Sequence, residues 1–144
     1  MQEDAARHRA EQAERAEYHV QARRIRSEQE SAKAQVLIDR FVERATQAGL
    51  ATEELTARPW SGRGRYRTGV VGWYLRRDGS IGVGVDGGFY LLAVAPVRFG
   101  QWRTVRVNPS PPPLEVGKGA KDGESFPLED LLEMRLQWPT SGGG

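Results

Sequence analysis

The sequence contains no cysteine and has two histidines among its 144 residues. The absence of cysteine excludes disulfides, thiolate zinc sites and cysteine nucleophiles. His8 and His19 are eleven residues apart in a segment of helical composition, about 16 Å along a helix axis, so they cannot share a metal ion or a proton. We therefore expect a protein that is not an enzyme and that binds no cofactor and no metal.

Long apolar runs are also absent. The longest stretch without a charged residue, 87–97, is about half of the roughly 20 residues that a membrane-spanning helix needs. The first residues lack the apolar stretch of a signal peptide. With 28% charged residues and a mean hydropathy of -0.61, the chain is expected to be a cytoplasmic protein without a membrane-spanning segment.

The small net charge of +2 hides a segregation of charge along the chain. Residues 1–57 hold nine basic and eleven acidic side chains, and residues 108–144 hold three basic and six acidic ones. Between them, residues 58–107 hold nine arginines against Asp78 and Asp86. The middle of the chain is therefore strongly basic, and both flanks are acidic.

Residues 1–33 are rich in Ala, Glu, Gln and Arg, a composition that favours a helix but offers little to bury. Glu3 and Arg7 are spaced to form an ion pair across one helical turn. This segment is predicted to be a charged helical tail. Whether it is a coiled coil, a lone helix or disordered is left open, although four small residues, Ala6, Ala10, Ala13 and Val20, could form a thin coiled-coil seam.

Apolar residues recur at intervals of three and four between residues 34 and 50, which predicts one apolar face of a helix. Gly49 is a natural helix stop. The helix is expected to cover a sheet with Leu37, Ile38 and Phe41. A further helical turn is predicted at residues 52–57, ended by Pro59.

Residues 68–96 predict three antiparallel strands joined by two tight turns, because Asp78-Gly79 and Gly87-Gly88 both suit two-residue hairpin loops. These loops place Trp73 opposite Gly84 and Leu75 opposite Gly82. A fourth strand is predicted at residues 102–107.

The predicted alternation gives the sheet two apolar faces. One is bulky and suited to packing under a helix, with Val70, Tyr74, Ile81, Val83, Val85, Tyr90, Leu92 and Val94. The other contains a bare glycine strip, which either is filled by the side chains of Trp73 and Leu75 or forms the floor of a contact groove. The residues of this predicted protein-contact groove are Trp73, Leu75, Gly82, Gly84, Phe89 and Leu91.

The remaining segments complete the predicted organisation. Residues 108–125 read as a Pro- and Gly-rich linker, residues 126–138 as a C-terminal helix capped by Ser125, and residues 139–144 as a disordered end. Residues 34–107 form the core. The fold class is therefore α+β, with an amphipathic helix packed on a four-stranded antiparallel meander, a short C-terminal helix and the N-terminal tail.

A basic aromatic segment precedes the first predicted strand. Arg63-Gly64-Arg65 resembles the R-G-R core of the AT-hook family over three residues, without that family's flanking prolines. The resemblance implies arginines that enter the minor groove of A·T-rich DNA. Basic side chains also bind phosphates, and aromatic rings stack on unpaired bases. Candidate nucleic-acid contacts are Trp60, Arg63, Arg65, Tyr66 and Arg67.

Two functions follow from these patterns. The first is a small cytoplasmic adaptor or regulatory domain that works by protein–protein association, as a homodimer, with the groove as its contact surface and the tail as a second contact. The alternative is a nucleic-acid-binding protein that uses residues 60–67. No membrane partner and no small-molecule substrate are indicated.

Overall fold

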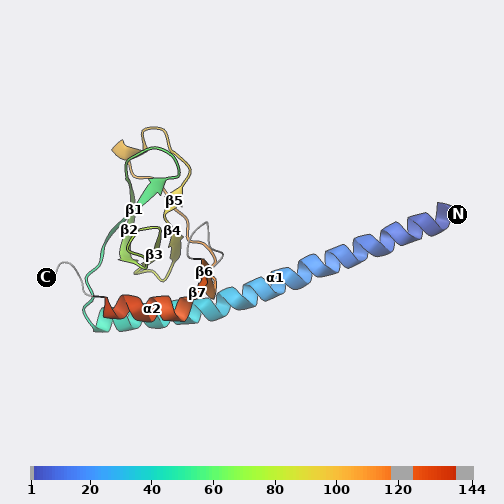
Figure 1. Ribbon diagram of the computed structural model, residues 1–144, viewed down its shortest axis with the longest axis horizontal. Helices are drawn as coiled ribbons and strands as arrows, with labels where there is room; N and C mark the ends of the chain where they lie inside the picture. The colour runs from blue at the N-terminus through green and yellow to red at the C-terminus, as the bar shows by residue number, and fades with distance from the viewer. Residues whose placement is uncertain (1, 118–124, 139–144) are drawn as a thin grey trace.

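The computed structural model describes residues 2–117 and 125–138 and has an α+β fold (Figure 1), which confirms the predicted class. A long helix is followed by a mixed sheet, a two-stranded ribbon and a short helix. The elements are α1 (Gln2–Gln47), β1 (Glu53–Pro59), β2 (Tyr66–Tyr74), β3 (Ile81–Gly84), β4 (Phe89–Leu91), β5 (Ala93–Val94), the 3-10 helix η1 (Gly100–Trp102), β6 (Glu115–Gly117), β7 (Ser125–Pro127) and α2 (Leu128–Gln137).

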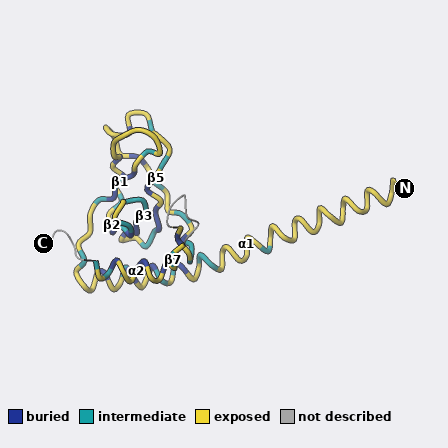
Figure 2. Tube along the Cα trace, viewed as in Figure 1, coloured by how far each residue is buried: buried dark blue, intermediate teal, exposed yellow. Residues whose placement is uncertain are grey.

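Helix α1 has 46 residues and is therefore about 69 Å long. It runs without a break through residue 33, and its N-terminal part projects away from the rest of the molecule (Figure 1). That part is mostly exposed (Figure 2). The first buried residue of α1 is Ala34. The predicted stop is confirmed: Gly49 has a φ of 69°, and Leu50 N donates to Ala45 O in a Schellman-type cap.

The main sheet has five strands in the order β4-β3-β2-β1-β5. Neighbouring strands are antiparallel except β1 and β5, which are parallel. The helical turn predicted at residues 52–57 is wrong, because this segment is strand β1. Leu55 and Ala57 alternate inward from it, and pairing with β2 outweighs the helix propensity of its Glu, Leu and Ala residues.

The strand predicted at residues 102–107 is also wrong. The chain turns through η1 and then meets the sheet at two isolated bridges, Arg67 with Thr104 and Phe89 with Ser110. The fifth strand position is taken instead by β5, which continues the chain from β4 and pairs with β1. Within 108–125, β6 and β7 pair with each other, and residues 118–124 lie outside the described part of the chain.

The first predicted hairpin register is wrong by one residue. Trp73 pairs with Val83, and Tyr74 pairs with Gly82. The turn is longer than two residues because Asp78 Oδ1 accepts hydrogen bonds from Ser80 N and Ser80 Oγ, which holds Ser80 inside the loop. A one-residue slip moves every β3 side chain to the opposite face, so Val83 rather than Gly84 lies beside Trp73.

A two-residue loop at Gly87-Gly88 would place Asp86 opposite Phe89 and Gly82 opposite Ala93. This register is wrong by three residues, because Val83 pairs with Phe89 and Gly82 with Tyr90. Asp86 sets this longer turn: its Oδ1 accepts from Gly88 N, and its Oδ2 accepts from the Tyr90 hydroxyl at 2.8 Å. The glycines therefore lie on the face away from the helices.

Side chains fill the glycine strip on that face. A Cβ on Gly82 would lie 2.8 Å from Leu55 Cδ1 and 3.2 Å from Leu92 Cδ1. A Cβ on Gly84 would lie 3.1 Å from the Tyr90 ring. Of the two interpretations of the strip, packing therefore holds, although the filling residues are not the predicted Trp73 and Leu75.

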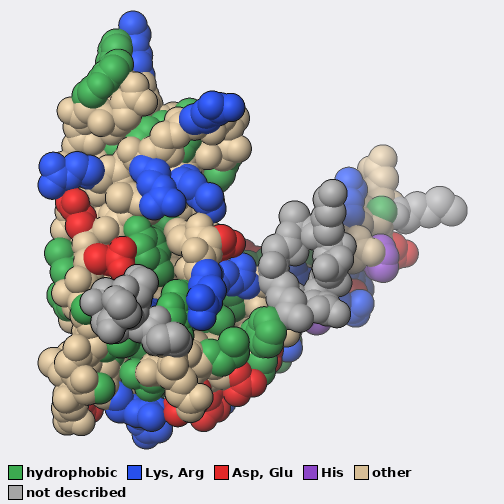
Figure 3. All heavy atoms as spheres, turned by 60° about the vertical axis from the view of Figure 1, so that its left-hand side comes forward, with side chains coloured by type: hydrophobic (Ala, Val, Ile, Leu, Met, Phe, Trp, Pro, Cys, Tyr) green, Lys and Arg blue, Asp and Glu red, His purple; other side chains and the backbone are tan. Residues whose placement is uncertain are grey.

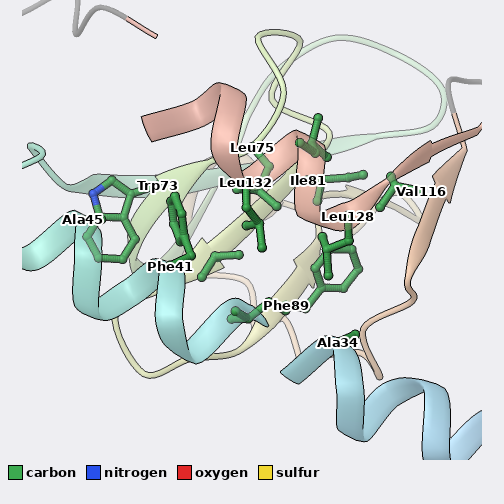
Figure 4. Packing of buried hydrophobic residues seen from close by; sticks show 13 residues of the cluster. Ala34, Phe41, Ala45, Trp73, Leu75, Ile81, Phe89, Val116, Leu128 and Leu132 are labelled. Atoms are coloured by element: carbon green, nitrogen blue, oxygen red, sulfur yellow. The ribbon is translucent and has the colours of Figure 1, made fainter. Parts of the chain in front are cut away.

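The main core lies between the sheet and the two helices (Figure 4). Trp73 of β2 meets Phe41 of α1 edge to face, with ring centroids 5.5 Å apart, and its Nε1 donates to Leu50 O. Leu128 and Leu132 of α2 close the same cluster. The sheet is thus anchored on the C-terminal third of α1.

Helix α2 lies along α1 and is joined to it by Arg44, whose guanidinium makes two contacts to the Glu133 carboxylate at 2.7 and 3.2 Å. Ser125 does not cap α2 as predicted, because it lies in β7 and its hydroxyl donates to Glu115. None of the helices in the described ranges is long and apolar enough to cross a membrane.

Candidate functional site

The predicted contact groove is not an open surface. Trp73, Leu75 and Phe89 are each at most 2% exposed and belong to the core under α1 and α2. Gly82 and Gly84 face the other side of the sheet, and Leu91 is exposed near the edge. The structure therefore does not bring these six residues together on an accessible face.

Helix α1 instead carries apolar side chains on the side opposite its buried residues. Val36 is 49% exposed and lies two residues before the buried Ile38, which is about 200° around the helix. Ile25 is 54% exposed and lies about 180° from Ala34. The positions on this side follow one another at intervals of four and three. We call them the outer stripe: Tyr18, Ala22, Ile25, Gln29, Ala32 and Val36.

Intervals of four and three are the spacing of the d and a positions of a coiled coil. With Tyr18, Ile25 and Ala32 at d, the a positions hold Ala22, Gln29 and Val36. The outer stripe spans about 27 Å of helix. Sequence reasoning missed it, although the spacing was visible, because it followed the alternative seam of Ala6, Ala10, Ala13 and Val20.

Charged side chains flank the outer stripe with one sign on each side. The g positions hold Glu14, Gln21, Glu28 and Gln35. The e positions hold basic residues or histidine, namely His19, Arg26, Lys33 and Arg40. Among the described residues, Glu28 and Lys33 form no ion pair with another side chain. The two edges of the outer stripe are therefore electrically complementary to each other.

A shallow groove of about 410 Å³ runs beside the outer stripe, between α1 and the proline segment that follows the sheet. Ala32 belongs to both the groove and the stripe, and Pro111 and Pro112 form the opposite wall. A second helix seated on the stripe would lie along this groove.

The opposite end of the sheet carries a different surface, which we call the basic lobe: residues 58–67 and 94–106. It contains seven arginines and no acidic residue. Figure 3 shows Lys and Arg side chains gathered with hydrophobic ones at the upper end of one face, and Asp and Glu side chains lower down. Two arginines have partners, since Arg67 pairs with Glu54 and Arg58 donates to Asp78 O. The other five are exposed: Arg63, Arg65, Arg98, Arg103 and Arg106.

Three large aromatic side chains stand out from the basic lobe. Trp60 is 74% exposed, Trp102 is 73% exposed and Phe99 is 57% exposed. The rings of Phe99 and Trp102 are 5.7 Å apart at 30°, and the Arg98 guanidinium lies 5.1 Å from the Phe99 ring centre. Sequence reasoning found Trp60 but missed Phe99 and Trp102, because residues 102–107 were interpreted as a strand.

Two predicted nucleic-acid contacts have structural partners, one within the basic lobe and one outside it. Tyr66 is buried, and its hydroxyl accepts from Val97 N at 3.1 Å and donates to Val97 O. Its ring packs against Gly100, where a Cβ would approach within 2.7 Å. Tyr66 therefore ties the two loops of the lobe together, and Arg67 holds Glu54. Trp60, Arg63 and Arg65 remain at the surface.

A hollow of about 490 Å³ lies between α2 and the turn after β2. Leu75, Leu131 and Met134 are among its lining residues, with Arg76, Arg77 and Asp78 at its charged parts. Partial burial acts to raise the pKa of Asp78, but hydrogen bonds from Ser80 and the nearby Arg76 outweigh it and lower the pKa. Asp78 therefore serves as a turn-forming carboxylate that binds Ser80.

Arg135 of α2 is the most deeply buried charged side chain among the described residues. Its Nε donates to Tyr74 O at 2.7 Å, and its guanidinium lies 4.4 Å from the Trp138 ring centre. Burial and the neighbouring Arg77 lower the pKa of Arg135, while Glu53 acts to raise it. Arg135 thus fastens α2 to the end of β2.

Neither a metal site nor a relationship to a known family assigns a function to the outer stripe or the basic lobe. Within residues 2–117 and 125–138, no group of three or more His, Cys, Asp or Glu side chains could hold a metal ion. Comparison with models of protein families, with curated proteins and with solved structures finds no match to this chain.

Proposed function

We propose that this protein is a non-enzymatic cytoplasmic adaptor that pairs with a second copy of itself through α1. The two helices form a short parallel coiled coil along the outer stripe. Each copy then holds its α+β domain at the same end of the pair. The observation that carries the proposal is the apolar outer stripe, exposed on the side of α1 that its own domain leaves free.

The first support is energetic. Most of α1 lies beyond its domain, and an isolated helix gains its stability chiefly from packing an apolar face. Full burial of an isoleucine or valine side chain contributes about 1.5 to 3 kcal/mol. Pairing would bury Ile25 and Val36 in both copies, which gives α1 a packed face on the side that its own domain leaves uncovered.

The second support is charge complementarity, which selects a parallel second copy. In a parallel pair, each g position meets the next e position of the partner helix. Glu28 then faces Lys33 of the second copy, and Glu14 faces His19. In an antiparallel pair, e meets e and g meets g, so that Arg26 and Lys33 would meet other basic residues. Gln29, at an a position, is a polar residue of the kind that fixes register.

The proposal is tested by Ile25→Asp, which places a charge in the middle of the outer stripe. Val20→Asp is the matched control, because Val20 has the same 54% exposure but lies at the f position on the outside of the pair. Light scattering across a range of protein concentrations should give a dimer mass for wild type and Val20→Asp, and a monomer mass for Ile25→Asp.

A wild-type mass that stays monomeric at every concentration would contradict the proposal. So would a dimer that Ile25→Asp leaves intact, because the contact would then lie elsewhere. Circular dichroism of each variant checks that the α+β domain is retained.

A further inference from the structure

We propose that the basic lobe is a binding site for single-stranded nucleic acid. Trp60 and Trp102 are its base-stacking platforms, and its phosphate contacts are Arg63, Arg65, Arg98, Arg103 and Arg106. This inference concerns the end of the sheet away from α1 and does not depend on pairing through the outer stripe.

The positive charge of the basic lobe indicates that its ligand is a polyanion. Its seven arginines lie within 23 residues of sequence, 58–67 and 94–106, that contain no acidic side chain. All seven are exposed; two of them are held by Glu54 and by Asp78 O, and the other five form no ion pair with another described residue. Guanidinium groups bind phosphate oxygens and also stack on bases.

The exposed aromatic side chains indicate that the ligand presents unpaired bases. Sequence-tolerant proteins for single strands combine a basic track with exposed aromatic rings on which successive bases stack. Trp60 and Trp102 are nearly three-quarters exposed, although tryptophan is normally a well-buried residue. Bases inside a duplex are already stacked on each other, so two protruding indole rings favour a single strand.

The backbone supports an outward-facing ring at Phe99. Phe99 has a φ of 58°, a left-handed conformation that is costly for a bulky residue. Gly100 N donates to Val97 O, and Trp102 N donates to Phe99 O, so the turn is held on both sides of Phe99. The conformation keeps Phe99 in the solvent beside Trp102 instead of in the core.

A hollow of about 220 Å³ lies between the two loops and favours a base over a lipid chain. Its lining is mainly polar and includes Arg63 and Gln101, with Phe99 and Trp102 beside them. A nucleobase presents a flat face and hydrogen-bonding edges that match both kinds of group. The lobe contains no Leu, Ile or Met, side chains on which membrane-inserting surfaces commonly rely.

The test measures fluorescence anisotropy of labelled single-stranded oligonucleotides, oligo-dT and oligo-U, with the full chain at low salt. Trp60→Ala with Trp102→Ala should weaken binding roughly tenfold or more. Arg63→Ala with Arg65→Ala should weaken it and reduce its salt dependence. The control is Arg7→Ala with Arg23→Ala, which removes the same charge from the exposed part of α1 and should leave the affinity unchanged.

Three outcomes would overturn the inference. One is the absence of binding to either oligonucleotide at low salt. Another is an equal loss of affinity in the lobe variants and in the α1 control, which would indicate charge alone. The third is tighter binding to vesicles of anionic phospholipid than to oligonucleotides, lost in the tryptophan variant, which would make the lobe a membrane-contact surface. Because every substituted side chain is exposed, circular dichroism should show an unchanged fold in each variant.

Discussion

Val36 and Ile38 are two residues apart on α1 and lie on opposite sides of it. Ile38 is completely buried against the sheet, whereas Val36 is half exposed on the outer stripe. One helix therefore serves two surfaces: its inner side completes the core of its own domain, and its outer side is free for a second helix. The adaptor function proposed above depends on this division.

Gly72 is expected to be the least replaceable glycine of the sheet. A Cβ at this position of β2 would lie 2.0 Å from Val83 O and 2.7 Å from Gly84 Cα, both backbone atoms that cannot move without disturbing the pairing of β2 with β3. Gly72→Ala should lower the free energy of unfolding by about 3 kcal/mol or more. Urea unfolding followed by tryptophan fluorescence measures the change.

The control for that substitution is Gly117→Ala, because a Cβ on Gly117 of β6 meets no atom of the described residues within 4 Å. It should change the free energy of unfolding by less than about 0.5 kcal/mol. Equal unfolding midpoints for the two variants would show that β2 and β3 do not approach each other as described.

Tyr90 predicts a loss of stability at alkaline pH. Burial, together with the hydrogen bond to Asp86 and its negative charge, raises the pKa of Tyr90 from 10.0 to about 12. The fold thus favours the protonated phenol, and this contribution is fully present below pH 10 and is lost as the pH rises through about 12. Unfolding measured in urea between these pH values should show the decline in wild type and a smaller decline in Tyr90→Phe.

Tyr18→Phe is the matched control for the tyrosine measurement, because Tyr18 lies on the projecting part of α1 and phenylalanine keeps the ring at its d position. It should retain the wild-type alkaline decline. A Tyr90→Phe protein with an undiminished decline would mean that Asp86 and Tyr90 do not share a hydrogen bond in the folded protein.

Helix α1, its stop at Gly49 and the C-terminal helix could be predicted because each depends on local signals. Apolar spacing identified Leu37, Ile38 and Phe41 as a buried face, and a glycine with positive φ ended it. Strand β1 could not be predicted in this way. The residues of 53–57 favour a helix locally, and they form a strand because β2 lies alongside them.

The hairpin registers could not be predicted because side chains in the turns set them. The sequence marks Asp78-Gly79 and Gly87-Gly88 as turns, but Asp78 binds Ser80, and Asp86 binds Gly88 and Tyr90, and both loops become longer. The resulting slips moved Gly82 and Gly84 away from Trp73. The predicted contact groove required Gly82 and Gly84 to lie beside Trp73, and the observed registers place them elsewhere.

The candidate surfaces were only partly visible in the sequence. The arginine surplus of residues 58–107 and the exposed Trp60 were found, since charge and composition need no folded structure. Phe99 and Trp102 are exposed in the same lobe as Trp60 because the chain turns at η1. Local sequence patterns do not predict this turn. The spacing of the outer stripe can be recognised in the sequence. Only the structure shows that the domain covers the other side of α1 and leaves this side exposed.

Pairing of two copies through α1 is tested most directly by disulfide trapping, which the absence of native cysteine makes simple. Tyr18→Cys places a thiol at a d position, and Val20→Cys places one at the outward f position as a control. Under mild oxidation, the parallel pair predicts a covalent dimer of Tyr18→Cys and little or none of Val20→Cys on a non-reducing gel. Equal trapping of both variants, or a Tyr18→Cys protein that stays monomeric, would contradict a parallel pair, because an antiparallel arrangement places residue 18 near Val36, about 27 Å along the helix.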